Sequence, residues 1–299
     1  REVGREIRHE ERDDARDLIT AQEFLMRVSI GLHFQAGKPH DVLNRDAQLR
    51  IAREREIAST TGQRPVERFM QTYFRHSGTI ADICRRFVSA HQSPPLARRA
   101  ADSLLTHRLN GYLKVGPGFL DVSKRHRPAV LGDLEEILKI YHSAALYGVL
   151  PTAELAEAIR VSLPKEPPPL SETSARLFRE ILGKSGGLGT LLRSMYDIGL
   201  LELLLPDMAH ARCLLQFNLL HSYTVDEHTL RTIEAAERFE TEPTAVGAAY
   251  RAIGHKEMLH LALLLHDLGK GFDEDHSVVG ERIALRVAER LRLSDNDRD

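Results

Sequence analysis

The stretch LHLALLLHDLGKGFDEDHS, residues 259–277, closes a nearly unbroken run of leucine with a histidine and an aspartate side by side. The segment over about 256–268 is apolar on every side, so we expect a helix at the centre of its domain. A carboxylate such as Asp267 is costly to bury unless a partner or a metal compensates its charge. The stretch therefore predicts a buried helix that carries His266 and Asp267 to a site with a cationic partner.

The composition indicates a globular protein of ordinary charge. The 299 residues are 42% hydrophobic, which is enough for two ordinary domains, and the charges leave a formal net charge of −2. We therefore expect neither nucleic-acid nor membrane binding. Cys84 and Cys213 are too few for a disulfide framework, and no apolar run reaches about eighteen residues. Since the first residues do not resemble a signal peptide, we expect a cytoplasmic protein.

Apolar residues recur at helical spacing along most of the chain, which predicts an all-α fold. The stretch GYLKVGPGFLDVS, residues 111–123, instead alternates apolar and polar positions around Gly116-Pro117-Gly118. It predicts a short β-hairpin, with a phosphate-binding loop as the less favoured alternative. We expect no more than this one hairpin. The predicted helices cover about 18–36, 45–59, 65–91, 94–107, 133–148, 152–161, 172–183, 187–198 and 200–205.

A proline-rich stretch, LPKEPPPL at 163–170, interrupts this pattern and predicts a stiff, extended spacer. We place a domain boundary there, with a helical region over 1–163 and a second helical domain over 164–299. The GGLG at 186–189 lacks a preceding strand and a third glycine, so we interpret it as the start of a helix. Both ends of the chain look cut, and we expect it to be a piece of a longer protein.

Two further helices should begin near histidines. Thr224 and Glu227 have the spacing of a capping box, so a helix is expected to start at Thr224 and to place His228 just past its first turn. Another helix should begin near Ser277, with His276 at its mouth. The ends of these helices and of the leucine-rich helix can therefore converge.

Convergence of His228, His266 and Asp267 would assemble a ligand set suited to a divalent ion. Imidazole nitrogen together with carboxylate oxygen is accepted by zinc, manganese, iron and magnesium. A simpler alternative is that Asp267 forms a salt bridge with Lys270. A single histidine on a helix is usually a core or surface residue, and we favour that interpretation for His221, His255 and His260.

The motif resembles the HD superfamily of metal-dependent phosphohydrolases. His228 in EHTLR matches the first histidine of that family, and His266-Asp267 in LLLHDLGKG match its His-Asp doublet. The resemblance implies that these three residues bind a divalent metal, with manganese or magnesium first and iron or zinc as alternatives. It also implies that Lys270 lies near a substrate phosphate and that His276 joins or supports the site.

A fourth ligand, an aspartate several tens of residues after the doublet, is also implied by the family pattern. Asp295, Asp297 and Asp299 come too early for it. We therefore expect the last ligand to be absent from this chain, so that the domain over 164–299 is an HD domain truncated at its carboxyl end.

Five longer blocks resemble the bifunctional uridylyltransferase/uridylyl-removing enzymes that modify the PII nitrogen-signalling protein. The match spans about 20–290, and YTVDEHTLR and LLHDLGKG are its most specific blocks. The other blocks are PVERFMQTYFRHSGTI, FLMRVSIGLHFQAGKPHDVL and RSMYDIGLLELLLPDM. The transferase half of such enzymes has a Gly-Ser loop and an Asp-x-Asp pair on a strand, and no Gly-Ser dipeptide occurs here. The region 1–163 would then lie behind a missing nucleotidyltransferase domain.

The resemblance implies that this piece hydrolyses UMP from uridylylated PII at the HD site. UMP and UTP would be ligands through the full-length enzyme. Two alternatives remain open: a catalytically silent regulatory scaffold that docks PII, and an HD hydrolase that acts on free nucleotides. A protein substrate requires an open surface around the site, whereas a nucleotidase requires a closed pocket.

Overall fold

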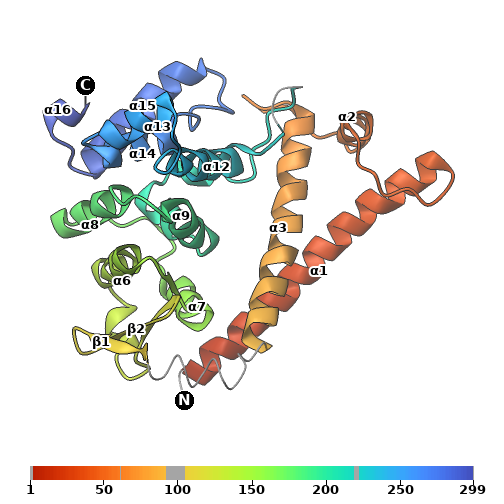
Figure 1. Ribbon diagram of the computed structural model, residues 1–299. Helices are drawn as coiled ribbons and strands as arrows, with labels where there is room; N and C mark the ends of the chain where they lie inside the picture. Colours follow the sequence, from red (N-terminus) through yellow and green to blue (C-terminus); the bar gives the residue numbers. More distant parts are fainter. Residues whose placement is uncertain (1–2, 61, 92–104, 219–221, 299) are drawn as a thin grey trace. The chain divides into compact units, whose positions relative to one another are not determined.

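The computed structural model describes residues 3–60, 62–91, 105–218 and 222–298, and helices make up most of it (Figure 1). The predicted all-α class is confirmed. No helix within these ranges combines the length and the apolar character needed to cross a membrane.

The chain forms two compact units. Unit 1 comprises Arg1–His91, Arg212–Val225 and Gly271–Asp273, and unit 2 comprises Gln92–Ala211, Asp226–Lys270 and Glu274–Asp299.

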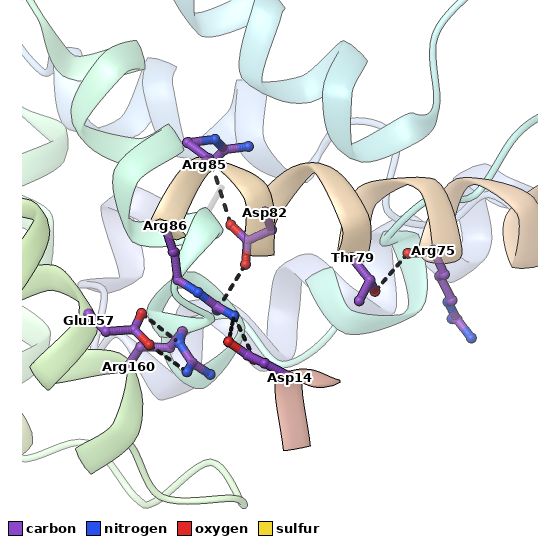
Figure 2. Close-up of polar contacts among 8 residues, drawn as sticks. All are labelled: Asp14, Arg75, Thr79, Asp82, Arg85, Arg86, Glu157 and Arg160. Carbon is purple, nitrogen blue, oxygen red and sulfur yellow. Dashed lines mark hydrogen bonds and ion pairs between the residues drawn. The ribbon is translucent and has the colours of Figure 1, made fainter. Parts of the chain in front are cut away.

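Unit 1 is built on three helices, α1 (Val3–Ala36), α2 (Arg45–Glu54) and α3 (Pro65–His91). α1 and α3 run antiparallel. At one end Arg86 of α3 donates to both carboxylate oxygens of Asp14 at 2.7 Å (Figure 2). Further along, the rings of Phe24 and His76 stack with centroids 4.5 Å apart. The core between the helices contains Val28, Leu32, Ala47, Ile51, Ala52, Val66, Phe69 and Met70.

The bounds of these helices follow the sequence prediction with two differences. α3 has the predicted bounds, and α1 begins earlier than residue 18. α2 ends at Glu54 although a helix was predicted to residue 59. The reason is local, because Arg55 caps the helix and Glu56 has a φ of +49°, a left-handed backbone conformation that cannot continue a right-handed helix.

The named strands of the described residues all lie in unit 2, where they form a four-stranded sheet in the order β1-β2-β3-β4. The predicted hairpin is present as β2 (Leu113–Gly116) and β3 (Phe119–Val122), which pair antiparallel. Its two-residue loop suits a tight turn, because proline fixes φ at Pro117 and Gly118 adopts a φ of +81°. Two short strands make the sheet larger than predicted, β1 (His107–Leu109) antiparallel to β2, and β4 (Leu150–Pro151) parallel to β3.

The helix predicted over 94–107 falls mostly on residues 92–104, outside the described part of the chain. Its last predicted position, His107, begins β1 instead. The short strands β1 and β4 are only three and two residues long, too short to produce a recognisable alternation in the sequence.

Eleven helices accompany the sheet in the described part of unit 2, besides α12, which begins at the last residue of unit 1. α6 packs against α8 and α9, and α14 packs against α8 and α15 (Figure 1). α13 and the short helices α5, α11 and α16 were not predicted. The eleven are α5 (Arg127–Val130), α6 (Leu134–Tyr147), α7 (Ala153–Ser162), α8 (Glu172–Leu182), α9 (Leu188–Asp197), α10 (Leu200–Leu204), α11 (Met208–Ala211), α13 (Ala245–Ala252), α14 (Lys256–Leu265), α15 (His276–Arg290) and α16 (Asp295–Arg298).

The proline-rich stretch is free of regular secondary structure, in keeping with an extended segment. It packs within unit 2, because Leu170 is buried and Arg290 of α15 donates to the carbonyl of Pro168 at 2.6 Å. Both sides of residue 163 belong to unit 2. The domain boundary placed there from the sequence remains a prediction.

Candidate metal centre

The leucine-rich helix ends at the predicted pair of polar residues. Buried Leu261, Leu264 and Leu265 anchor α14, and His266 is its carboxyl-terminal cap. The helix stops three residues before the predicted end at 268. The chain then turns twice, with hydrogen bonds from the Leu268 N–H to Leu265 and from the Lys270 N–H to Asp267. These turns expose one face of His266 and leave Asp267 8% exposed.

The first histidine comes from α12 (Val225–Arg238), which begins at the residue after Thr224 as the sequence predicts. Leu230 and Ile233 are fully buried and hold one face of α12 against unit 2. His228 lies in the first turn of the helix, on a face that remains partly open to solvent. The periodicity of α12 therefore separates an apolar anchoring face from the histidine.

A charged network fixes α12 against α9. Arg193 of α9 donates to Glu227 at 2.8 Å and to Glu234 at 3.0 Å, two carboxylates that lie two turns apart on α12. Burial of Glu227 opposes its charge, but the hydrogen bonds from Arg193 and Arg231 outweigh burial and lower the pKa of Glu227. The pairs are half-buried, so they contribute mainly by setting the position of the helix.

The GGLG stretch at 186–189 starts α9, as predicted, and it meets α12 at close range. The carboxylate of Glu237 accepts hydrogen bonds from the backbone N–H groups of Leu188 and Gly189, each at 2.7 Å. A carboxylate at this end satisfies free donors and complements the helix dipole. A Cβ at Gly189 would lie 2.5 Å from Cγ of Glu234, so glycine is required for this approach.

Three side chains converge where α12 meets the end of α14. Nε2 of His228 lies 3.7 Å from Oδ2 of Asp267, and Nε2 of His266 lies 3.4 Å from the same oxygen. Each residue offers one ligand atom, and the three atoms lie within 4.8 Å of one another. The side chains of His228 and His266 are 42% and 35% exposed. The cluster therefore opens to solvent on its histidine side.

The ring of His266 is oriented for ligation. Its Nδ1–H donates to the carbonyl of Leu263 at 2.8 Å, which turns Nε2 toward Asp267. A hydrogen bond of this kind fixes the tautomer of metal-binding histidines. Contact with the Asp267 carboxylate raises the pKa of His266, while burial opposes the change. Nε2 of His266 therefore faces the Asp267 carboxylate across 3.4 Å, where the two atoms could share a cation.

Lys270 forms the ion pair that the sequence left open as an alternative. Its Nζ donates to Oδ2 of Asp267 at 2.8 Å, and both side chains are nearly buried. Burial of Asp267 disfavours its charge, but hydrogen bonds from His266 and Lys270 outweigh burial and hold the pKa of this carboxyl well below its usual range. His210 of α11 fixes the backbone here, with Nε2 3.1 Å from the Lys270 carbonyl oxygen.

The donor set fits a divalent metal. Metal bonds of about 2.0–2.2 Å place neighbouring ligand atoms about 3.0–3.5 Å apart, depending on coordination geometry. The separations of 3.4 and 3.7 Å from Asp267 are close to this range. Solvent access on the histidine side of the cluster would leave positions for water and substrate. Both the salt bridge to Lys270 and metal binding require an ionised Asp267, and the lowered pKa of this carboxyl favours that form despite its burial.

Gly269 brings the turn after Asp267 against α15. A Cβ at Gly269 would lie 2.0 Å from the carbonyl oxygen of His276 and 2.7 Å from the nitrogen of Gly280. α15 begins at His276, one residue before the predicted start, with Asp275 as its cap. His276 is exposed, and the ligand group found among the described residues does not include it. Its role in the site remains a prediction.

The other histidines behave as their isolated positions suggest. His260 is fully buried, with Nδ1 donating to the Leu182 carbonyl at 2.6 Å and Nε2 2.9 Å from the Tyr250 hydroxyl. The carbonyl can only accept, so Nδ1 carries the proton and Nε2 accepts from tyrosine. His255 is exposed and lies 3.2 Å from Glu257. His221 lies outside the described residues.

No later aspartate joins the cluster among the residues that the structure describes. Asp295 begins α16, and Asp297 accepts a hydrogen bond from Ser294 at 2.7 Å. Neither belongs to the group of ligand atoms. Asp299 lies outside the described residues, and the expectation of a fourth ligand elsewhere remains a prediction.

Comparisons with known proteins match both parts of the chain. The family described as GlnD PII-uridylyltransferase matches residues 5–88, and the HD domain family matches residues 225–298. The second range contains all five predicted site residues. Residues 225–298 are therefore an HD domain.

Curated relatives match nearly the whole chain. Bifunctional uridylyltransferase/uridylyl-removing enzymes of Ruegeria pomeroyi and Cereibacter sphaeroides are 35% and 33% identical over 94% and 95% of it. The enzyme of the same name from Rhodospirillum rubrum is 30% identical over 93%. The chain is related to one segment of these bifunctional enzymes. It spans only 30–32% of their length, and the resemblance seen in the sequence is confirmed for that segment.

Sequence reasoning missed the residues that hold the cluster in place. Arg193 and Glu237 fix α12, and His210 fixes the turn at Lys270. The sequence did contain a signal for the anchoring of α12. Glu227, Glu234 and Glu237 share one face of this helix, which indicates a neighbouring surface with basic side chains or free N–H groups. Which residues supply those partners depends on contacts more than thirty residues apart.

Proposed function

We propose that this chain carries the uridylyl-removing centre of its family, a metal-dependent phosphodiesterase that releases UMP from uridylylated PII. His228, His266 and Asp267 would hold the metal. The observation that carries the proposal is the convergence of their three ligand atoms within 4.8 Å inside the HD domain. The whole relatives have a transferase activity as well, for which we assign no residues here.

The side chains of the cluster divide the work of phosphodiester hydrolysis. A divalent metal bound here would lower the pKa of a bound water and polarise the phosphoryl oxygen. Lys270 supplies a fixed positive charge beside Asp267, where it can offset charge that develops on the phosphate. His276 is the first residue of α15, and its backbone carbonyl lies against Gly269. From this position His276 would assist Lys270 in offsetting charge on the phosphate. A tyrosine linked to UMP is a workable leaving group, because its phenol has a pKa near 10.

The exposure of the cluster favours a protein substrate over a free nucleotide. His228 and His266 are 42% and 35% exposed, as a site on an open surface requires. Two cavities of about 370 and 300 Å³ in unit 2 are lined by other residues, and neither includes a residue of the cluster. A nucleotidase would need an enclosing pocket to bind its small substrate.

The test is release of UMP from uridylylated PII by this chain during a titration with Mn²⁺. We expect metal-dependent release by the wild type and its loss in the His266→Ala/Asp267→Ala double variant. His255→Ala is the matched control, because it removes an exposed histidine of the same unit that pairs with Glu257 and lies outside the cluster. It should release UMP at the wild-type rate.

Three outcomes would oppose the proposal. Release that persists in the double variant would place the hydrolytic centre elsewhere. No release by folded wild type that binds uridylylated PII would favour the regulatory scaffold, in which the HD domain docks PII without turnover. Hydrolysis of free nucleotides but not of uridylylated PII would identify a nucleotide hydrolase.

A further inference from the structure

The chain segments on both sides of the candidate metal centre belong to unit 1, although the metal-binding side chains belong to unit 2. Arg212–Val225 leads directly into Asp226 and ends three residues before His228. Gly271–Asp273 directly follows Lys270. Unit 1 is therefore linked covalently to the centre at two points.

The first flanking segment is held by a buried carboxylate of α3. Oε1 of Glu67 accepts from the backbone N–H of Phe217 at 2.9 Å, and Oε2 accepts from the backbone N–H of Arg64 at 2.8 Å. Glu67 is 9% exposed. Arg64 and Arg45 lie over the ring of Phe217 at 5.7 and 5.4 Å, and Gln71 donates to the Arg212 carbonyl at 3.0 Å.

The held segment is connected to the first turn of α12. Leu214 is 2% exposed, and its carbonyl oxygen accepts from the backbone N–H of Val225 at 2.8 Å. Val225 is the first residue of α12 and is itself buried. The start of the helix that carries His228 is thus attached to a segment that Glu67 and the core of unit 1 hold in place.

The second flanking segment lies in close backbone contact with Gly62. A Cβ at Gly62 would lie 2.4 Å from the backbone carbon of Phe272 and 2.6 Å from the carbonyl oxygen of Gly271. Gly62 also has a φ of +86°, which other residues rarely adopt. Only glycine allows this close backbone contact with the segment that follows Lys270.

We propose that Glu67 and Gly62 are positioning residues for the metal centre, although neither touches it. The stretch 62–71 of unit 1 holds the entry to α12 and the exit from the His266-Asp267 turn, and so sets the spacing between His228 and Asp267. This inference rests on the proposed function in one respect, the presence of a metal. Loss of partners that orient metal ligands typically weakens metal affinity about 10–100-fold.

The test compares Mn²⁺ affinity of the wild type, Glu67→Ala and Gly62→Ala by calorimetry, with circular dichroism to establish folding. We expect affinity to fall at least about tenfold in both variants, with partial recovery in Glu67→Gln, which keeps one acceptor oxygen. Asp41→Ala is the matched control. Asp41 also accepts side-chain hydrogen bonds in unit 1, from Ser29 and His33, but on no segment that leads to the centre.

Hydrogen exchange supplies a readout that needs no metal. Glu67→Ala should accelerate exchange of the amides over 225–231, whereas Asp41→Ala should leave them unchanged. Absence of Mn²⁺ binding by the wild type would defeat the proposed function, and faster exchange in Glu67→Ala would still support the positioning role. Wild-type exchange over 225–231 together with wild-type Mn²⁺ affinity in folded Glu67→Ala would overturn the inference.

Discussion

Replacing Gly269 with alanine should disturb the metal centre through the backbone alone. The added Cβ would lie 2.0 Å from the His276 carbonyl oxygen and 2.7 Å from the Gly280 nitrogen. Carbon atoms rarely approach such atoms within about 3 Å, so the turn after Asp267 and the first turn of α15 must separate by about 1 Å. Both contacts are with backbone atoms of a helix, which cannot rotate away as a side chain can.

The cost follows from this displacement. Overpacking of a well-packed interior typically destabilises by about 1–3 kcal/mol, and rigid backbone on both sides favours the upper end. About 3 kcal/mol corresponds to a fall in Tm of about 6–12 °C for a unit of this size. The same shift would move Asp267 relative to His228, so Mn²⁺ affinity should fall about tenfold or more.

The matched control is Gly280→Ala, a substitution on the other side of the same contact. Its Cβ would meet no atom within 4 Å, and the position is helical. It should leave Mn²⁺ affinity unchanged and raise stability by about 0.5–1 kcal/mol. Thermal unfolding and Mn²⁺ calorimetry measure both effects. Wild-type Tm and affinity in Gly269→Ala would refute the reasoning from the close contact.

Three further predictions concern the supports of the centre. Arg193→Gln should lower the free energy of unfolding by roughly 1 kcal/mol, measured by denaturant titration, because two carboxylates on α12 lose their partner; an unchanged midpoint would contradict the anchoring role. His260→Ala should lower the free energy of unfolding by about 2–4 kcal/mol, because the Tyr250 hydroxyl and the Leu182 carbonyl lose their partner. Mn²⁺ affinity of the folded variant should equal that of the wild type. Weaker affinity would make His260 part of the centre. Burial opposes the charge of Glu67, but hydrogen bonds from Arg64 and Phe217 outweigh burial and lower the pKa of Glu67. The ionised Glu67 side chain therefore stabilises the fold fully above its ordinary pKa of 4.5, and this stabilisation is lost as the pH falls through the lowered pKa. The stability gap between wild type and Glu67→Gln should therefore shrink below about pH 4.5, and a gap independent of pH would contradict this.

Local patterns in the sequence were sufficient for most helices and for the hairpin. The helix start after Thr224 and the turn at Pro117-Gly118 were predicted from residues within a few positions, and Gly187 at the start of α9 adopts a φ of +86° that favours glycine. α13 was missed because AVGAAYRA contains small residues with little apolar periodicity. In each case the signal lies within one or two helical turns of the feature.

The cluster itself could be predicted only with the family resemblance. The residues alone indicate a buried carboxylate beside a histidine, and they leave the salt bridge with Lys270 and a metal as alternatives. The structure contains that salt bridge and also places His228 beside the same carboxylate. His228 and Asp267 are 39 positions apart in sequence, and no local spacing determines the distance between their side chains.

The composition of unit 1 was the least accessible from the sequence. The boundary at 163 was placed from proline content, whereas Arg212–Val225 and Gly271–Asp273 belong to a unit built mainly from residues before 92. Glu67 meets Phe217 across 150 positions in sequence. Hydrogen bonds between residues so far apart produce no periodic pattern in the sequence, because each partner could equally bond to many other residues.

Binding of Mn²⁺ to this chain tests the central claim most directly. Calorimetric titration of the wild type should reveal one site per chain. His228→Ala and His266→Ala should each weaken binding by more than about 100-fold, since loss of a ligand exceeds the loss of an outer partner, whereas His255→Ala should bind as the wild type does. No Mn²⁺ binding by the folded wild type would contradict a metal centre at His228, His266 and Asp267. Wild-type Mn²⁺ affinity in both histidine variants would contradict it as well.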